Sequence, residues 1–389
     1  MATDTAQRNQ RKRHAGNAVV LMVGTLITGL MTSAVAVDMS YLYAENTLLQ
    51  SAADSAALAA THELVRNSGT SASAIRTAAR GAASSTATSN SQGTQNPVRI
   101  DQNVDITFGY LNPADPTYNA GTFSTTNNST SYSFTGGYNA VRVRVRRTAG
   151  SPGGTIPSIM AKLFGVNLLS TQASAIALAD NRVSNVTSGL RPFYACQAQW
   201  NRTMTDGNPS NNTVRIYGNN HTVDGATVSG CPSNPAGNWG FADFRDNRSG
   251  APGNTTIARW IEDGYGTATG ENPVVVGQNY STQPGNAISS NGVRTALDSL
   301  IGGQGCGNST PATIITIPLI DSTSGSGSNA SYRISQLTGF EITDYRATGS
   351  ASSRYIEGHF TQSVCSNNCT TGTATGTNGG GNFKIRLVR

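Results

Sequence analysis

Apolar and small residues run without a charged residue from position 15 to position 37, and this is the strongest pattern in the chain. A helix of about 23 residues rises about 35 Å, which is enough to cross the roughly 30 Å hydrocarbon layer of a bilayer. The pattern therefore predicts a single transmembrane helix over residues 15–37. Arg8, Arg11, Lys12 and Arg13 precede it, and Asp38 and Glu45 follow it. The positive-inside rule then predicts a basic cytoplasmic tail over residues 1–14 and an exterior location for everything after Asp38.

The helical spacing does not stop at the end of the apolar run. Small and apolar residues recur at helical intervals as far as Arg66, and no proline or glycine interrupts them after Asp38. The residues in question are Met39, Leu42, Leu49, Ala52, Ala53, Ala56, Ala57 and Ala60. The membrane span and the Ala-rich helix outside it are therefore predicted to form one rod. Because alanine lets other backbones come close, two uses of this surface stay open: packing on the chain's own exterior domain, and self-association or contact with other helices.

Between the rod and residue 182 the pattern predicts a small domain of helices and strands. Residues 71–90 show weak helical spacing, and residues 104–111 alternate as a strand does. In residues 141–147 valines alternate with arginines, which predicts a strand with one apolar face and one arginine face. We expect the arginine face to be solvated, with binding of a partner as the alternative. Residues 155–166 predict a short helix, and residues 168–180 predict a strand that pairs back on the arginine strand.

The composition of the chain changes near residue 184, where cysteines, tryptophans and turn residues appear together. Strand-like segments alternate there with two helical ones, and a last strand over residues 383–389 is expected to close the domain. The fold class is predicted to be α+β. A long N-terminal helix precedes a small strand and helix domain over residues 38–182 and a larger β-rich, loop-rich domain over residues 183–389.

All five cysteines lie in the second half of the chain, and they are Cys196, Cys231, Cys306, Cys365 and Cys369. Outside the cytoplasm disulfides are the expected state, and the odd number leaves one thiol free or bonded to another chain. We expect Cys196 to pair with Cys231, and Cys306 to pair with Cys365 or Cys369. Only two histidines accompany these cysteines, so a zinc site is disfavoured.

The composition is typical of an exported surface protein. Charged residues make up 12% of the chain and aromatic residues 7%, so we expect small cores and long loops. Much of the net charge of +6 lies directly before the apolar run and in the arginine strand. No nucleic-acid-binding motif accompanies this charge, and nucleic acid is not an expected partner.

A search for catalytic or metal-binding motifs finds only incomplete ones. "HELVR" begins like a zinc protease signature, but Arg66 stands where the second histidine is required. Asp321 and the hydroxyls that follow it are similar to a cation-binding adhesion loop, yet Gly325 replaces the last serine, and we expect a Ser/Gly loop between strands. No catalytic residue, metal or cofactor is predicted, and the chain is not expected to be an enzyme.

An ordered set of short motifs accompanies the membrane span, among them "VD", "YL" and "LQSAADSAALAA". Its members are Gly16, Asn17, Val37, Asp38, Tyr41, Leu42, Leu49, Gln50, Ala52, Ala53, Asp54, Ala56 and Ala57. This set resembles the TadE/TadG-like N-terminal segment of TadG-like proteins of the Flp (tight adherence, Tad) pilus assembly system. The resemblance implies a single-pass protein of a bacterial inner membrane with a small pilin-like domain outside. Such a protein would anchor or initiate an adhesive, type IV-like pilus through contacts with pilin and other Tad proteins.

Two alternatives for the N-terminus stay open. Ala34 and Ala36 form a small-x-small pattern, and cleavage near Ala36 would release an exported surface-binding protein or a pilus-tip adhesin. Pilins related to the family carry a glutamate five residues after the glycine cut by prepilin peptidase, whereas Leu21 stands five residues after Gly16 here. The continuous helical pattern and the missing glutamate favour a retained anchor over either cleavage.

Overall fold

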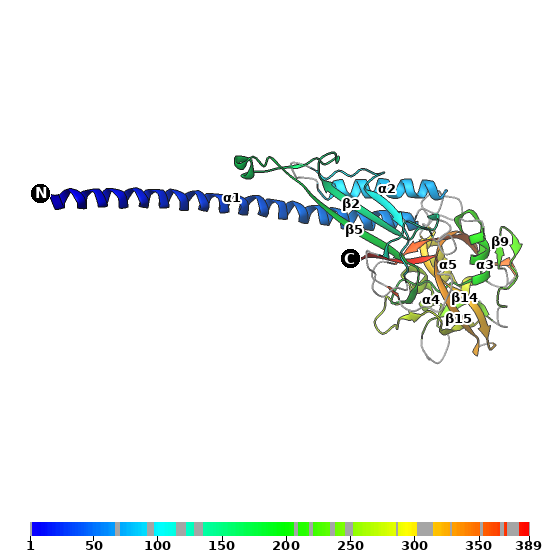
Figure 1. The fold of residues 1–389 in the computed structure, drawn as a ribbon. Helices are drawn as coiled ribbons and strands as arrows, with labels where there is room; N and C mark the ends of the chain where they lie inside the picture. Colours follow the sequence, from blue (N-terminus) through cyan, green and yellow to red (C-terminus); the bar gives the residue numbers. More distant parts are fainter. Residues whose placement is uncertain are drawn as a thin grey trace.

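The computed structural model of the chain describes residues 2–388 apart from residues 67–70, 92–96, 114–121, 128–134, 206–208, 218–220, 234–237, 246–251, 285–286, 302–313, 327–328, 351–352, 366–368 and 372–380. One long helix projects from a body made of two packed regions (Figure 1). The mixed α+β class with a β-rich C-terminal region is as predicted.

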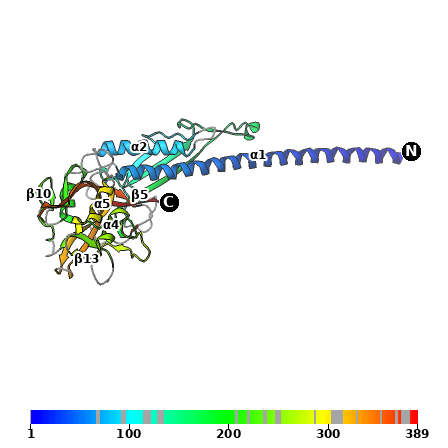
Figure 2. The same cartoon turned by 180° about the vertical axis from the view of Figure 1, so that it is seen from behind.

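The projecting helix, α1 (Ala2–Arg66), is continuous over 65 residues. At 1.5 Å per residue it is about 98 Å long. Its N-terminal half stands free of the body, and its C-terminal half lies within it (Figures 1 and 2). Among the described residues, α1 is the one helix long and apolar enough to cross a membrane. The prediction of an apolar helix that continues as an Ala-rich helix is confirmed.

The first region of the body consists of the outer half of α1, a second helix and a five-stranded sheet. Helix α2 (Ala72–Ser89) begins at Ser71, whose side chain accepts from the Ala74 N–H, and buries a face with a period of four residues. The strand order is β1 (Ile106–Gly109), β2 (Ala140–Arg147), β5 (Thr171–Asp180), β19 (Asn382–Val388) and β17 (Ser363–Val364). The predicted helix over 71–90 and the pairing of β5 with β2 are confirmed.

A narrow hairpin connects β2 to β5 and runs along α1 toward its N-terminus (Figures 1 and 2). It contains β3 (Ile156–Pro157), the 3-10 turn η3 (Ala161–Phe164) and β4 (Leu168–Leu169). We call residues 156–169 the 156–169 hairpin. The short helix predicted for residues 155–166 is therefore only a four-residue turn between two strands. It ends where Gly165 adopts the left-handed φ of +84°, a conformation that glycine allows without steric cost.

The second region follows β5 and is built on a larger sheet. Its strand order is β10 (Ala226–Thr227), β9 (Thr222–Val223), β8 (Val214–Ile216), β16 (Tyr355–Thr361), β15 (Ser331–Arg346), β13 (Asn279–Pro284) and β11 (Asn238–Asp243), and β14 (Ile314–Ser324) joins β15 to β7 (Ala195–Cys196). Its helices are α3 (Gln197–Thr205), α4 (Asn254–Glu262) and α5 (Asn291–Leu300), with 3-10 turns η4 (Pro209–Asn211) and η5 (Ala287–Ser289). The two helical segments predicted here are confirmed by α4 and α5.

The last strand does not close the second region, contrary to expectation. β19 returns to the first region and pairs with β5 in antiparallel register, with Lys384 opposite Asp180 and Val388 opposite Ile176. Apolar side chains of β19, including Ile385 and Leu387, pack against the first region's core. A smaller sheet of β12 (Val274–Val275), β6 (Val183–Val186) and β18 (Cys369–Thr371) lies close to the crossing. The chain therefore passes from the first region to the second and back.

Candidate functional site

Many of the motif residues lie along one side of α1. We call this set the motif stripe, and it consists of Asp38, Tyr41, Leu42, Leu49, Ala52, Ala53, Ala56 and Ala57. Intervals of three, four and seven residues place them on one face of the helix. Between residues 19 and 48 only Ala34 and Asp38, one turn apart, are buried. Val37 is exposed, and Gly16 and Asn17 lie in α1 before the described side chains begin.

The Asp38 carboxylate accepts hydrogen bonds from three consecutive backbone N–H groups of the 156–169 hairpin. The Ile159 N–H donates to Oδ1 over 2.9 Å, the Met160 nitrogen lies 3.1 and 3.2 Å from the two oxygens, and the Ala161 N–H donates to Oδ2. Hydrogen bonds to a charged acceptor are roughly twice as strong as neutral ones. This motif residue therefore fastens the beginning of η3 to α1.

The charge of Asp38 is stabilised where it lies. Burial by itself raises the pKa of this carboxyl, but the three N–H donors and the positive charge of Lys162 together outweigh burial, and the pKa is below its ordinary value. Hydrogen bonds to the ionised form produce such a lowering. The stabilisation is fully present above the unfolded-state pKa of roughly 3.9 and is lost as the pH falls through the lowered folded-state value.

Beyond the contact with Asp38, several backbone N–H and C=O groups of the hairpin are hydrogen-bonded to one another. The Ser158 N–H donates to the Asn167 carbonyl over 3.0 Å, and the Val166 N–H donates to the Ala161 carbonyl over 3.1 Å. The buried Ser158 hydroxyl donates to the Val166 carbonyl. A closed set of backbone hydrogen bonds gives this hairpin a defined shape.

The Ala-rich part of the motif stripe is occupied within the chain. Ala52, Ala53, Ala56 and Ala57 have no exposed surface, and they pack with Ile75, Ala79 and Ala83 of α2 and the apolar faces of β2 and β5. Small side chains allow this close approach of helix to helix and helix to sheet. Of the two uses left open by the sequence, packing on the chain's own domain is the one observed for this segment.

The remaining motif pair, Gln50 and Asp54, lies at an edge of the sheet. The Gln50 amide donates to the Asp54 carboxylate over 2.7 Å and reaches the Ser174 carbonyl of β5 at 3.4 Å. β19 ends opposite Ile176, so the first half of β5 has no strand on that side among the described residues. A groove of about 800 Å³ lies beside Gln50 and Asp54 and reaches Arg142 and Arg144 of β2.

The arginine face of β2 is not simply solvated, and that prediction is corrected. The Arg146 Nε lies 2.6 Å from the buried Asp105 carboxylate, and Arg144 lies 3.8 Å from it. The Arg142 guanidinium stacks 4.2 Å from the Phe123 ring centre. Asp105 and Phe123 lie outside β2, so the alternation of valine and arginine within β2 does not predict these contacts.

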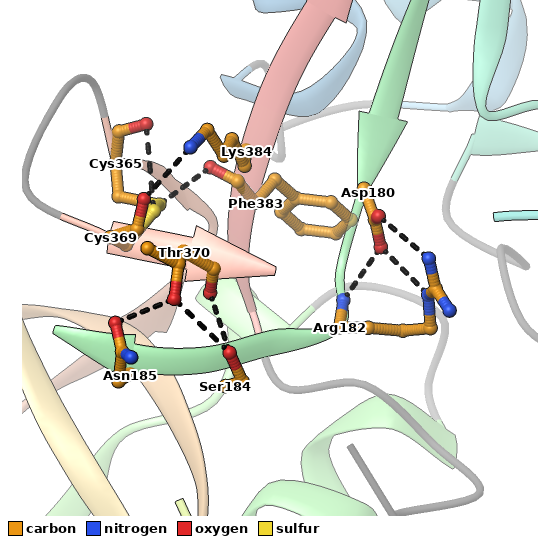
Figure 3. Close-up of a disulfide and its surroundings, with 9 residues drawn as sticks. All are labelled: Asp180, Arg182, Ser184, Asn185, Cys365, Cys369, Thr370, Phe383 and Lys384. Carbon is orange, nitrogen blue, oxygen red and sulfur yellow. Dashed lines mark hydrogen bonds and ion pairs between the residues drawn. A yellow bond between two sulfur atoms is a disulfide. The ribbon is translucent and has the colours of Figure 1, made fainter. Parts of the chain in front are cut away.

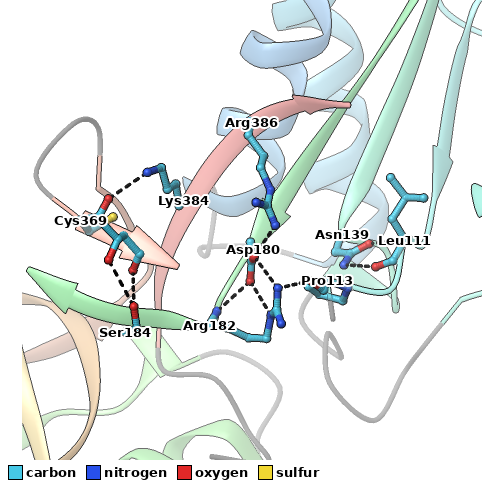
Figure 4. Close-up of polar contacts among 10 residues, drawn as sticks. Leu111, Pro113, Asn139, Asp180, Arg182, Ser184, Cys369, Lys384 and Arg386 are labelled. Carbon is cyan, nitrogen blue, oxygen red and sulfur yellow. Dashed lines mark hydrogen bonds and ion pairs between the residues drawn. The ribbon is translucent and has the colours of Figure 1, made fainter. Parts of the chain in front are cut away.

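A second arginine cluster lies where the chain crosses between the two regions (Figure 4). The Asp180 carboxylate, which is fully buried, accepts from Arg182 and from Arg386 of β19 at 3.0 and 2.6 Å. Two guanidinium groups around one buried carboxylate compensate its loss of hydration. The cluster joins the outgoing end of β5 to the returning strand.

Two disulfides are present among the described residues. The expected bond between Cys196 and Cys231 is confirmed, with a Cα separation of 5.4 Å. The expectation that Cys306 pairs with Cys365 or Cys369 is wrong for both of these partners, because Cys365 and Cys369 bond to each other. Their Cα atoms lie 6.0 Å apart, within the range that a disulfide spans. Cys306 itself lies outside the described residues.

The second bond lies beside the crossing strand (Figure 3). The Lys384 ammonium of β19 donates to the Cys369 carbonyl over 2.9 Å, and the Cys365 N–H donates to the Phe383 carbonyl over 2.9 Å. On the other side of β18, the Ser184 hydroxyl donates to the Thr370 carbonyl over 3.1 Å. The disulfide loop therefore connects β19 with β6.

The stretch that begins at Asp321 is not a loop. Asp321 and Ser322 continue strand β14, and Asp321 forms an exposed ion pair with Arg333 of β15. Within the described part of the chain, no group of three or more His, Cys, Asp or Glu side chains is arranged to hold a metal ion.

The residues that sequence reasoning missed are the hairpin amides that bind Asp38. Backbone N–H groups carry no side-chain signature, so Ile159, Met160 and Ala161 gave no sign of this contact. The one available signal was the surplus of apolar residues in "TIPSIMAKLFGVNLL", which exceeds what a four-residue turn can bury.

Comparison with known families finds two matches in the N-terminal part of the chain. Residues 16–85 match a family model described as Flp pilus-assembly TadE/G-like, and residues 52–179 match one described as Tad-like Flp pilus-assembly. Together the matches cover α1 from Gly16 onward, α2, β2 and nearly all of β5. No curated protein and no solved structure matches the chain.

Proposed function

Because residues 16–179 identify the chain as a TadG-like protein of the Flp/Tad pilus assembly system, we propose that it is a single-pass inner-membrane component of that machine. Its N-terminus lies in the cytoplasm and its two regions lie outside. The protein anchors or initiates the pilus through contacts with pilin and other Tad proteins. The proposal gives the chain no reaction, no cofactor and no nucleic-acid partner.

The observation that carries this proposal is the continuity of α1. The apolar segment and the buried Ala-rich segment belong to one helix without a break. A force on the exterior regions is then transmitted to the membrane span through a stiff element, since a sharp kink in a continuous helix requires a local disruption of its hydrogen bonds. This is the property expected of an anchor for a fibre under load.

The membrane half of α1 offers a surface for partner helices. Gly24 and Gly29 have no other atoms within 4 Å of where a Cβ would stand, so neighbouring helices can approach closely. The Thr28 and Ser33 hydroxyls donate to carbonyls of α1 itself, which satisfies them inside a bilayer. We propose that contacts with pilin helices, or with a second copy, use this small-residue face.

A deletion strain complemented with variants of α1 tests the anchoring role. Ala44→Pro interrupts the helix at an exposed position between the membrane and the body, at a cost of about 3 kcal/mol or more. We expect surface pili and adhesion to be lost while the protein remains in the membrane fraction. Ala44→Ser is the matched control and should restore pili.

Normal pili in the deletion strain would contradict the proposal. Mass spectrometry of the native N-terminus addresses the remaining alternative: a mature chain that begins near Val37 in the medium would indicate a released adhesin instead of an anchor.

A further inference from the structure

The 156–169 hairpin exposes apolar side chains that the first region leaves uncovered. Leu163 is 71% exposed and Leu168 60%, and Ile159, Met160 and Val166 are also exposed. Beyond α1, the described residues include eight exposed large apolar side chains, and these five lie within ten consecutive positions. A soluble surface rarely gathers such residues without a partner.

We infer that the 156–169 hairpin is a second membrane-contacting element, which rests in the outer interface of the same bilayer that α1 crosses. This inference rests on the proposed membrane anchor. The partner is the lipid surface itself, at the boundary between headgroups and acyl chains.

The position of the hairpin along α1 sets its depth. A hydrocarbon layer of roughly 30 Å takes about 20 helical residues, and a span that ends at Val37 places Asp38 at its outer boundary. Asp38 holds the hairpin at this level, and Ala34, which lies one turn deeper, is buried. In Figure 1 the hairpin extends beside α1 toward the projecting half of the helix. The exposed apolar side chains therefore meet the membrane where α1 leaves it.

Several backbone N–H groups of the hairpin are already hydrogen-bonded within the protein, which suits a region of low water content. Unsatisfied peptide groups are costly in a membrane, and here the amides of Ile159, Met160 and Ala161 are satisfied by Asp38. The Leu163 N–H donates to the Met160 carbonyl and the Gly165 N–H to the Lys162 carbonyl. Apolar side chains can then enter the interface without leaving these donors unpaired.

The charge of this segment favours a lipid surface. Residues 149–179 contain no aspartate or glutamate, and Lys162 lies exposed in η3 among the apolar side chains. A segment without acidic residues is not repelled by an anionic lipid surface, and a lysine close to such a surface is attracted to it. Two points of attachment would fix the tilt and rotation of α1, so the exterior regions would present the same side to the pilus machine.

The test uses the full chain in lipid nanodiscs with one copy per disc. An environment-sensitive fluorophore is attached through Leu163→Cys. The Cys306→Ser background removes the competing thiol, since the other four cysteines are paired in the two disulfides. We expect a blue-shifted emission and strong quenching by spin-labelled lipid. The same label at the exposed Val275→Cys of the second region is the control and should show neither. Emission at position 163 equal to that at 275 would overturn the inference.

A third label, at Met22→Cys within the apolar half of α1, separates this inference from the proposed function. Quenching at position 22 without quenching at 163 removes the hairpin contact and keeps the anchor. No quenching at either position removes the membrane anchor itself. If position 163 becomes shielded only in discs with two copies or with added pilin, the surface binds protein and the lipid assignment is overturned.

Asp38→Asn tests how the hairpin is held. An asparagine has one acceptor oxygen and no charge, so it cannot hold three N–H groups as the carboxylate does. We expect the lipid quenching at position 163 to fall while quenching at position 22 is unchanged. Unchanged quenching at 163 would show that Asp38 does not position the hairpin, and would overturn the depth argument.

Discussion

The two regions of the body reach stability with different side chains. Among the described residues, the main core cluster of the first region holds 21 buried residues, of which eleven are alanines and Phe108 is the one aromatic. The second buries Trp260, Phe244 and Tyr265 in mutual contact, with ring centres 5.1 to 6.2 Å apart, and carries both described disulfides. Large aromatic rings fill the space between short strands and irregular loops.

The difference in the size of the core side chains matches a difference in the backbone that each region packs. Small side chains bring α1 close to its neighbours along more than two turns, which fixes a long helix accurately but leaves no room for added atoms. A core of large rings tolerates irregular backbone around it but depends on a few residues. The first region should therefore be sensitive to added volume and the second to removed volume.

Spectroscopy can follow the two regions separately. All three tryptophans, Trp200, Trp239 and Trp260, belong to the second region. Outside the free half of α1, most helical residues belong to the outer half of α1 and to α2. Tryptophan fluorescence thus reports the second region, and the helical circular dichroism signal reports mainly the first.

The largest expected effect is that of Trp260→Ala. Trp260 is fully buried, contacts Tyr265 and Phe244, and donates its indole N–H to Glu271 over 2.9 Å. Truncation should cost about 3–5 kcal/mol of the free energy of unfolding. Urea titration in detergent, followed by the remaining tryptophans, measures it.

In that titration we expect the helical signal to shift less than the fluorescence. Equal shifts in both signals would mean that β19 couples the two regions into one cooperative unfolding unit. The two regions would then unfold together, whatever the difference between their cores. Trp260→Phe, which keeps much of the ring volume, should lose less stability than the alanine variant.

Added volume in the first region should come next. Ala56→Leu inserts three carbon atoms between α1, α2 and the sheet, where Ala56 has no exposed surface, and should cost about 1–3 kcal/mol. The helical signal in a urea titration measures the loss. Ala44→Leu makes the same change at an exposed position of α1 and should be close to neutral. If both variants behave alike, the Ala-rich core is not closely packed.

The third expected effect, close in size to that of Ala56→Leu, is a loss of stability in mild acid that is confined to the second region. Burial lowers the pKa of His221 to about 4, so the folded region holds this imidazole neutral. The stabilisation is present above the unfolded-state value of about 6.5 and is lost as the pH falls toward the folded-state value. Between about pH 7.5 and pH 5 this amounts to about 2 kcal/mol.

Fluorescence-detected unfolding at the two pH values tests the acid sensitivity. His221→Gln, which removes the titrating group, should flatten the dependence. The helical signal of the first region serves as an internal reference. A pH dependence in the variant as steep as in the parent chain would assign the effect to other groups.

Local patterns predicted the helices and strands well because each pattern depends only on residues that are close together in the sequence. The continuity of α1 from residue 15 to Arg66, the alternation of β2 and the helices α4 and α5 follow from spacing alone, whereas the extension of α1 back to Ala2 was not predicted. The bond between Cys196 and Cys231 was also expected, and it closes a separation of 35 residues. The wrong pairing of Cys306 arose because sequence spacing does not show which cysteines a turn brings together.

The contacts that position these elements join residues that lie far apart in the sequence. Asp38 meets amides 121 to 123 positions later, and Asp180 meets Arg386 206 positions later. Arg146 lies 41 positions from Asp105, and its pairing is invisible in the alternating pattern. Each contact depends on the order and crossing of the strands. The sequence around one partner therefore does not indicate which distant residue it will contact.

By itself, the sequence determined that a continuous apolar and Ala-rich helix leads into an α+β body, because periodicity and the length of an uncharged run are local quantities. Only the tertiary structure decided that the motif aspartate fastens a distant apolar hairpin, that the Ala-rich face is buried within the chain, and that the last strand returns to the first region. These outcomes depend on backbone amides and on strand order, which hydrophobic periodicity does not encode.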